Sequence, residues 1–242
     1  MNIVTSRPEY TLEGRTFRGY LAQDDAITGP RPGVIIVHEW WGLNDYIVKR
    51  AHKLAELGYM ALAIDMYGDG QTAGNPDDAG GLMNAVLTDM AAGTAALRAG
   101  YQVLLEQPGV DASRTAAIGY CFGGAMVLHM ARIGLPLRAV GSFHGALGSF
   151  HTAEPGSIVA KLLVCHGEAD TMVTMEDLAT FKHEMDTAQA DYEVLVLPDA
   201  KHGFSNPDAT ANGTKYGIDV GYQPEADAAS WGKLCELFDQ VF

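Results

Sequence analysis

Short apolar runs alternate with longer amphipathic stretches along most of this chain. The short runs end at glycine, proline or polar clusters, a pattern typical of strands buried on both faces of a parallel sheet. The longer stretches have helical spacing, and Gly58 closes the first of them. The alternation predicts an α/β fold. The expected strands are 33–39, 59–65, 115–118, 137–143, 161–167 and 192–197, and the expected helices are 46–57, 77–106 (as one helix or two), 125–133 and 224–242.

Two segments depart from this alternation. Residues 10–12 and 16–22, separated by Glu13-Gly14-Arg15, are predicted to form an amino-terminal hairpin. Residues 205–223 are polar and contain the dipeptides Asn206-Pro207 and Asn212-Gly213, which favour turns. They are predicted to form a surface loop beside the expected active site.

The strand expected at 115–118 ends in Gly-x-Cys-x-Gly, residues 119–123. A sharp turn from strand to helix strains the backbone at the bend, and small residues two before and two after it let the chain pass. This is the nucleophile elbow of the α/β-hydrolases, with Cys121 where serine usually stands. The first amides of the following helix would stabilise an anion there. From these five residues alone, the alternative is a plain turn with Cys121 as a small buried hydrophobe.

Acids and histidines stand at three other strand ends. Glu39 ends the strand 33–39, Asp170 follows the strand 161–167, and His202 follows the strand 192–197. Loops at the carboxyl ends of parallel strands converge on one crevice. The order Cys121, Asp170, His202 is the order of nucleophile, acid and histidine in this fold class. Glu168 is the competing candidate for the acid.

The chemistry of these side chains supports a hydrolase. A free thiol with a pKa of about 8.5 is mostly protonated at neutral pH, so Cys121 needs a base. His202 can take the proton while Asp170 holds the useful tautomer of the imidazole. Glu39 beside a thiolate would be a like-charge contact, which predicts a resting thiol that ionises when substrate displaces the carboxylate. Lactones, enol esters and thioesters, which have good leaving groups, are therefore expected as substrates rather than amides.

Six motifs spread along the chain belong together: Tyr10–Gly14, Phe17–Leu21, His38–Asn44, Gly119–Gly124, Gly167–Val173 and Lys201–Phe204. Through them, nearly the whole chain resembles the dienelactone hydrolase family. The resemblance implies a single α/β-hydrolase domain over residues 1–242, with a mostly parallel central sheet flanked by helices on both faces. It implies a carboxylic ester or lactone hydrolase of the carboxymethylenebutenolidase type, with a Cys121, His202 and Asp170 triad. Glu39 would control the ionisation of the cysteine, and the backbone amides of Phe122 and Trp40 would form the oxyanion hole.

One departure from that family concerns the substrate. In its chlorocatechol-pathway members, arginines hold the carboxylate of the dienelactone. Here no arginine lies between Arg50 and Arg98, and none follows Arg138. Lys201 adjoins His202, but a point charge is a poorer clamp than a bidentate guanidinium. A neutral or weakly polar acyl substrate is therefore expected, in a pocket lined by Trp41, Tyr120, Phe204 and Lys201, with ordinary packing as the alternative for Trp41.

Composition narrows the functional classes. The 242 residues carry a net charge of −14, which argues against nucleic acid or an anionic membrane surface as a partner. Three cysteines without metal spacing, and no signal-like segment, indicate reduced thiols in a cytoplasmic protein. The expected partner is a small ester or lactone, and the expected state is a monomer or small homo-oligomer. A non-catalytic binding protein of the same fold is the alternative function.

No cofactor or metal is expected. His38-Glu39 forms half of a zinc-binding His-Glu-x-x-His motif, but Gly42 occupies the second histidine position. His38 is instead expected to bond to backbone at a strand end. His144 and His166 are expected to have satisfied structural roles, although both could line the pocket.

Overall fold

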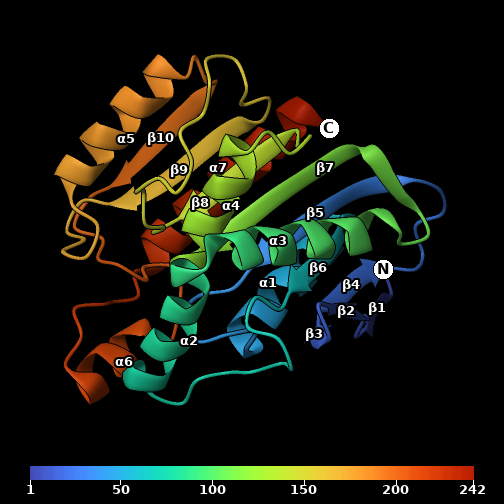
Figure 1. The fold of residues 1–242 in the computed structure, drawn as a ribbon, viewed down its shortest axis with the longest axis horizontal. Helices are drawn as coiled ribbons and strands as arrows, with labels where there is room; N and C mark the ends of the chain where they lie inside the picture. Colours follow the sequence, from blue (N-terminus) through green and yellow to red (C-terminus); the bar gives the residue numbers. More distant parts are fainter. The chain divides into compact units, whose positions relative to one another are not determined.

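Strands and helices alternate in each half of the chain (Figure 1). The apolar runs of the sequence form the buried strands. The computed structural model describes residues 1–242, which divide into a first unit, Met1–Ala117, and a second unit, Ile118–Phe242. Strand β7 (Val110–Tyr120) crosses the boundary. Its residues 110–117 belong to the first unit and its residues 118–120 to the second. The expected α/β class is confirmed in both units, because strands and helices alternate along the chain.

In the first unit, the strand order is β1-β4-β6-β5-β7. Strands β5 and β6 are parallel, and β4 is antiparallel to both β1 and β6. All five residues of β6 and the last five of β5 are buried, which explains their continuous apolar sequence. The elements are β1 (Ile3–Ser6), β2 (Glu9–Leu12), β3 (Arg15–Arg18), β4 (Tyr20–Asp24), β5 (Arg31–Val37), α1 (Asp45–Glu56), β6 (Met60–Ile64), α2 (Pro76–Thr88) and α3 (Met90–Leu105).

The predicted amino-terminal hairpin is confirmed, but its second strand is shorter than expected. Glu13 and Gly14 both have positive φ, the geometry of a two-residue hairpin turn between β2 and β3. The expected strand 16–22 is wrong at Gly19, where the chain leaves this hairpin and joins the larger sheet as β4. A Cβ at Gly19 would lie 3.1 Å from the carbonyl oxygen of Ala63, so the crossing favours glycine. Strand β1 had no counterpart in the sequence prediction.

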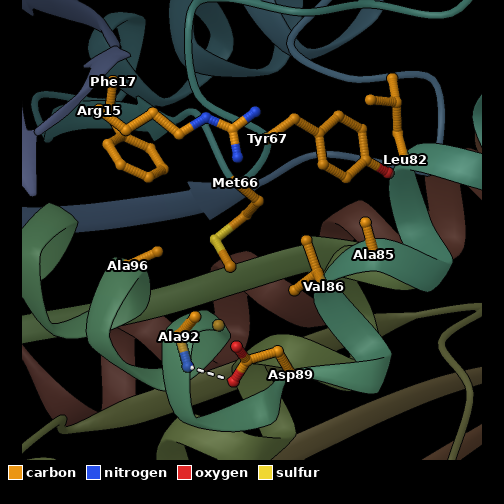
Figure 2. Close-up of a pocket in the computed structure, with 11 residues that line it drawn as sticks. Arg15, Phe17, Met66, Tyr67, Leu82, Ala85, Val86, Asp89, Ala92 and Ala96 are labelled. Atoms are coloured by element: carbon orange, nitrogen blue, oxygen red, sulfur yellow. Dashed lines mark hydrogen bonds between the residues drawn. The ribbon is translucent and has the colours of Figure 1, made fainter. Parts of the chain in front are cut away.

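The segment expected as one helix or two forms two helices. The Asp89 carboxylate caps α3 by accepting the Ala92 N–H at 3.0 Å, and Asp89 also ends α2. Figure 2 shows this bond beside a cavity of about 120 Å³. Helices α2 and α3 line the cavity together with Arg15, Met66 and Tyr67.

In the second unit, the strand order is β7-β8-β9-β10, and β8, β9 and β10 are mutually parallel (Figure 1). Every residue of α4 is buried, and α4 and α7 pack against β8. The bounds predicted for β9 and β10 are confirmed without a shift. The elements are α4 (Phe122–Arg132), β8 (Ala139–Phe143), β9 (Lys161–Gly167), α5 (Met175–Thr187), β10 (Tyr192–Leu197), α6 (Ala209–Tyr216) and α7 (Pro224–Val241).

The surface loop predicted for residues 205–223 is wrong in part. The segment contains helix α6, and Ser205 and Asn206 at its start are buried. The Asn212-Gly213 dipeptide lies inside the helix rather than in a turn. A Cβ at Gly213 would lie 2.7 Å from the Val220 carbonyl oxygen, so the glycine lets the returning chain pack closely against the helix. No helix of the protein has both the length and the apolar character that crossing a membrane requires.

Candidate active site

Cys121 stands at the strained bend between β7 and α4. Its φ and ψ are 53° and −116°, a conformation that non-glycine residues rarely adopt. The bend is held by the Cys121 N–H, which donates to the Phe143 carbonyl at 3.0 Å, and by the Cys121 carbonyl, which accepts the Gly124 N–H. A Cβ at Gly119 would collide with the carbonyl oxygen of Gly123. The glycine two residues before the cysteine is therefore required by the turn itself.

The position of Cys121 at the start of α4 places it at the positive end of a helix. Cys121 is the N-cap and Phe122 is the first helical residue. The first amides of a helix have no intrahelical acceptor, and the helix dipole favours negative charge beside them. A thiolate or an oxyanion at this point is stabilised by both effects.

Asp170 and His202 form a buried hydrogen-bonded pair. The Oδ2 atom of Asp170 lies 2.9 Å from Nδ1 of His202. The other oxygen, Oδ1, accepts the backbone N–H groups of Met172 and Val173, both at 2.9 Å. These bonds fix the plane of the carboxylate, while Glu168 is exposed. The structure therefore brings Asp170, and not Glu168, to the histidine.

The loops that carry this pair approach each other through Gly167, the last residue of β9. A Cβ there would collide with the carbonyl oxygen of Ala200. That same oxygen accepts the Ala169 N–H at 3.0 Å, which ties the Asp170 loop to the loop before His202. Sequence reasoning missed a further contact, in which the Gly221 N–H donates to the carbonyl of His202 at 3.0 Å. No local motif marks Gly221, because the contact joins segments separated by α6.

The charge on His202 follows from its partners. Burial alone would lower its pKa, but the negative charge of Cys121 and hydrogen bonds to Asp170 and Cys121 outweigh burial and raise the pKa to about 10. With Nδ1 bonded to Asp170, Nε2 is the nitrogen that faces Cys121. At neutral pH this balance favours the imidazolium form of His202. The resting thiol expected at Cys121 stays a prediction. The effect of Glu39 on that balance stays a prediction.

Two other buried histidines lie near this pair in the second unit. His144 has a positive φ of 41°, its Nε2 lies 2.8 Å from the Ser205 hydroxyl, and its ring centroid is 5.3 Å from that of His202. The hydrogen bond to Ser205 agrees with the expectation that His144 is a structural residue whose ring is hydrogen-bonded. The same expectation is wrong for His166, because neither of its buried ring nitrogens has a hydrogen-bond partner. Burial lowers the pKa of His166, which keeps the ring neutral.

Glu39 and Trp40 follow β5 in the first unit. Glu39 is 4% exposed, and the half-buried rings of Trp40 and Trp41 meet edge to face with centroids 5.0 Å apart. The predicted backbone bond of His38 is confirmed, since its Nδ1 lies 2.6 Å from the Glu39 carbonyl oxygen. The roles of Glu39 and Trp40 at the cysteine stay predictions.

The residues expected to contact substrate differ in exposure. Tyr120 and Phe204 are fully buried, Tyr120 stacked on Phe143 and Phe204 packed edge to face against His144. Lys201 is half-exposed, and its ammonium pairs with Asp219 at 2.6 Å. Lys201 therefore already has a counter-charge in this structure.

Comparisons with known proteins agree on one family. Residues 17–242 match the model described as "Dienelactone hydrolase family". The "Putative carboxymethylenebutenolidase" of Yersinia pestis is 27% identical, with 94% of this chain and 85% of that protein covered.

Two solved structures cover 100% of this chain and of their own chains. One, a dienelactone hydrolase-like promiscuous phosphotriesterase from metagenomic libraries, is 36% identical with a TM-score of 0.91. The other, described as m3DLH, is 37% identical with a TM-score of 0.93. The fold is therefore the α/β-hydrolase fold with a mostly parallel sheet, as predicted.

Proposed function

This chain belongs to the dienelactone hydrolase family, and we propose that it hydrolyses a lactone or activated ester through Cys121, His202 and Asp170. The observation that carries the proposal is the linked arrangement of these three side chains. Cys121 is held at a strained elbow, His202 is hydrogen-bonded to Asp170, and the pKa of His202 is raised to about 10 by both partners. A cysteine whose thiol can pass its proton to a hydrogen-bonded histidine reacts as the nucleophilic thiolate.

The proposed reaction has two halves. The Cys121 thiolate attacks the carbonyl carbon, and the resulting oxyanion receives hydrogen bonds from the backbone amides of Phe122 and Trp40. The adduct then collapses, the carbon–oxygen bond to the leaving group breaks, and the His202 imidazolium protonates that group. In the second half, neutral His202 removes a proton from water, the hydroxide attacks the acyl-cysteine, and the thiolate leaves. Asp170 keeps the imidazole oriented throughout.

The substrate we propose is neutral. A buried substrate carboxylate needs a paired cation, and its desolvation costs several kcal/mol without one. Lys201, the basic residue adjoining His202, is already paired with Asp219, whose other oxygen accepts the Thr171 hydroxyl at 2.7 Å. Releasing Lys201 to bind a substrate carboxylate would break that network. A methyl ester of a lactone acid should therefore be turned over with a higher kcat/KM than the free acid.

A phosphotriester is a second candidate substrate. The 36% identical structure that aligns over the full length of both chains is described as a promiscuous phosphotriesterase. A thiolate at an elbow can attack a tetrahedral phosphorus as well as a carbonyl carbon, provided the leaving group is good. Release of p-nitrophenol from a neutral p-nitrophenyl phosphotriester would support this activity, and no release would exclude it for that substrate.

Turnover of p-nitrophenyl acetate tests the proposed function directly. A burst of p-nitrophenol together with a mass increase of one acetyl group on the Cys121 peptide is expected. Steady turnover with the acetyl group on another residue would refute the assigned nucleophile. Absence of turnover of both esters and lactones would favour a non-catalytic binding protein.

A further inference from the structure

Trp40 N–H, one of the two proposed oxyanion donors, belongs to the peptide unit between Glu39 and Trp40. A trans peptide is planar, and its C=O and N–H point in opposite directions. Any group that fixes the Glu39 carbonyl therefore also fixes the direction of the Trp40 N–H. The catalytic value of such a donor depends on its direction being set before the reaction.

The Glu39 carbonyl has two hydrogen-bond partners, the backbone N–H of Gly42 at 3.1 Å and the side chain of His38. Nδ1 of His38 lies 2.6 Å from the Glu39 oxygen, and Nε2 accepts the backbone N–H of Met66 at 3.2 Å. An imidazole that accepts at Nε2 carries its proton on Nδ1, so Nδ1 donates to Glu39. The ring is fully buried, and burial lowers the pKa of His38, which agrees with a neutral ring even though Asp65 faces it.

The partner of His38 is itself anchored by a buried carboxylate. Oδ1 of Asp65 accepts the N–H groups of Tyr67 and Gly68, and Oδ2 accepts that of Gly70, each at 2.9 Å. These bonds hold the turn that begins at Met66. The His38 ring thus lies between two fixed backbone groups and has little freedom to rotate.

Tyr67 fixes the next peptide unit. Its hydroxyl donates to the Trp40 carbonyl at 2.9 Å, and its ring meets His38 edge to face with centroids 4.7 Å apart. Figure 2 shows the Tyr67 ring in the wall of the cavity formed with α2. Two consecutive peptide units, on either side of the Trp40 Cα, are therefore each held by a side chain.

We propose that His38 and Tyr67 are positioning residues for the oxyanion hole, which they serve by orienting the peptide units that flank Trp40. Neither touches the substrate. This inference rests on the proposed function, because it needs the Trp40 amide to act on an oxyanion.

Three variants and one control test the proposal. His38→Asn keeps an N–H where Nδ1 was, whereas His38→Gln keeps an acceptor where Nε2 was and loses the donor to Glu39. Tyr67→Phe removes only a hydroxyl. Tyr101→Phe is the matched control, because Tyr101 is a buried tyrosine of the same unit whose hydroxyl instead contacts Thr115 at 3.0 Å.

His38→Gln should lower kcat for a p-nitrophenyl ester by roughly 10- to 100-fold with little change in KM, since the lost interaction acts in the transition state. His38→Asn should recover most of that loss, and Tyr67→Phe should lower kcat by about threefold to tenfold. The Tyr101→Phe control should keep the wild-type kcat. Alkylation of Cys121 by iodoacetamide, which forms no oxyanion, should proceed at the wild-type rate in all four variants.

Equal kcat values for His38→Gln and His38→Asn, or a wild-type kcat in Tyr67→Phe, would overturn the proposal. A parallel fall in alkylation and turnover would do the same, because it would indicate general loosening of the site. If the two His38 variants do not fold, the comparison of kcat between Tyr67→Phe and Tyr101→Phe still tests the proposal. Failure of the proposed function is distinct, since it would appear as full ester turnover in Cys121→Ala.

Discussion

His202 and His38 are both buried histidines near the end of a strand, yet their surroundings favour different protonation states. The ring of His202 is favoured as the charged imidazolium, and the ring of His38 is favoured as the neutral form. His202 contacts the ionisable side chains of Asp170 and Cys121, and they raise its pKa to about 10 despite burial. His38 contacts backbone groups of Glu39 and Met66, and burial lowers its pKa. For His38, the backbone bonds and the nearby charge of Asp65 do not offset the desolvation of an imidazolium, whereas for His202 the charges and side-chain hydrogen bonds of Cys121 and Asp170 do. The arrangement around His202 suits proton transfer, and that around His38 suits holding a peptide in place.

The largest expected effect comes from removing the thiol. Cys121→Ala should abolish ester turnover and also lower the pKa of His202, because the negative charge of Cys121 is a main cause of its rise. Ring proton chemical shifts followed against pH would measure the second effect. Cys121→Ser should fold but turn over slowly, since the alkoxide is harder to form. A His202 titration unchanged in Cys121→Ala would mean that the charged pair does not form.

Next in size is the loss of the base or its orienting acid. His202→Ala should lower kcat by roughly three to four orders of magnitude, and Asp170→Asn by somewhat less. Glu168→Gln is the matched control, because Glu168 lies two residues from Asp170 but is exposed. A severe loss in Glu168→Gln beside a silent Asp170→Asn would reverse the assignment of the acid.

Gly167 lets the loop after β9 pack closely against the backbone before His202, and a substitution at Gly167 tests how much stability this close packing requires. Gly167→Ala should destabilise the protein by roughly 3 kcal/mol or more, because the new Cβ meets the backbone carbonyl of Ala200. Gly232→Ala in α7, where a Cβ meets nothing within 4 Å, should instead stabilise by up to about 1 kcal/mol. Urea unfolding of both variants measures the difference. Equal stability of the two would show that the β9 and β10 loops adjust freely.

The pH dependence of the free energy of unfolding should distinguish the contribution of His202 from that of His38. Because the folded pKa of His202 is raised, its contribution is fully present below its ordinary pKa of about 6.5 and is lost as the pH rises to about 10. The folded pKa of His38 is lowered, so its contribution is lost as the pH falls below about 6.5. Urea unfolding over this range should show a weaker alkaline decline in His202→Gln and a weaker acid decline in His38→Asn. Curves parallel to the wild type would contradict both assignments.

The smallest expected effect concerns Glu39, which is buried but not part of the Asp170 pair. If its carboxylate opposes a charge on Cys121, Glu39→Gln should shift the pH dependence of thiol alkylation toward lower pH without unfolding the protein. Alkylation by iodoacetamide across neutral pH provides the measurement. An unchanged profile would leave Glu39 as a structural residue in the segment that follows β5.

Several elements were predictable because their causes are local. Strands β9 and β10 are continuous apolar runs bounded by polar residues, and the elbow needs glycine beside a strained residue. The break at Gly19 and the helix containing Gly213 were not predictable. In both, the decisive neighbour is a carbonyl from another segment, Ala63 for the first and Val220 for the second. A glycine looks the same in sequence whether it ends an element or makes room for another chain segment.

The candidate site divides in the same way. Residue type and order were enough to nominate Cys121, Asp170 and His202, because a nucleophile, an acid and a histidine in that order at strand ends are a chemical pattern along the chain. Only the folded structure decided that Asp170 rather than Glu168 bonds to His202, and that Lys201 pairs with Asp219. The opposite pKa shifts of His202 and His38 also came from the fold. A charge state depends on burial and on the few groups within hydrogen-bonding reach, and folding brings those groups together from distant parts of the chain.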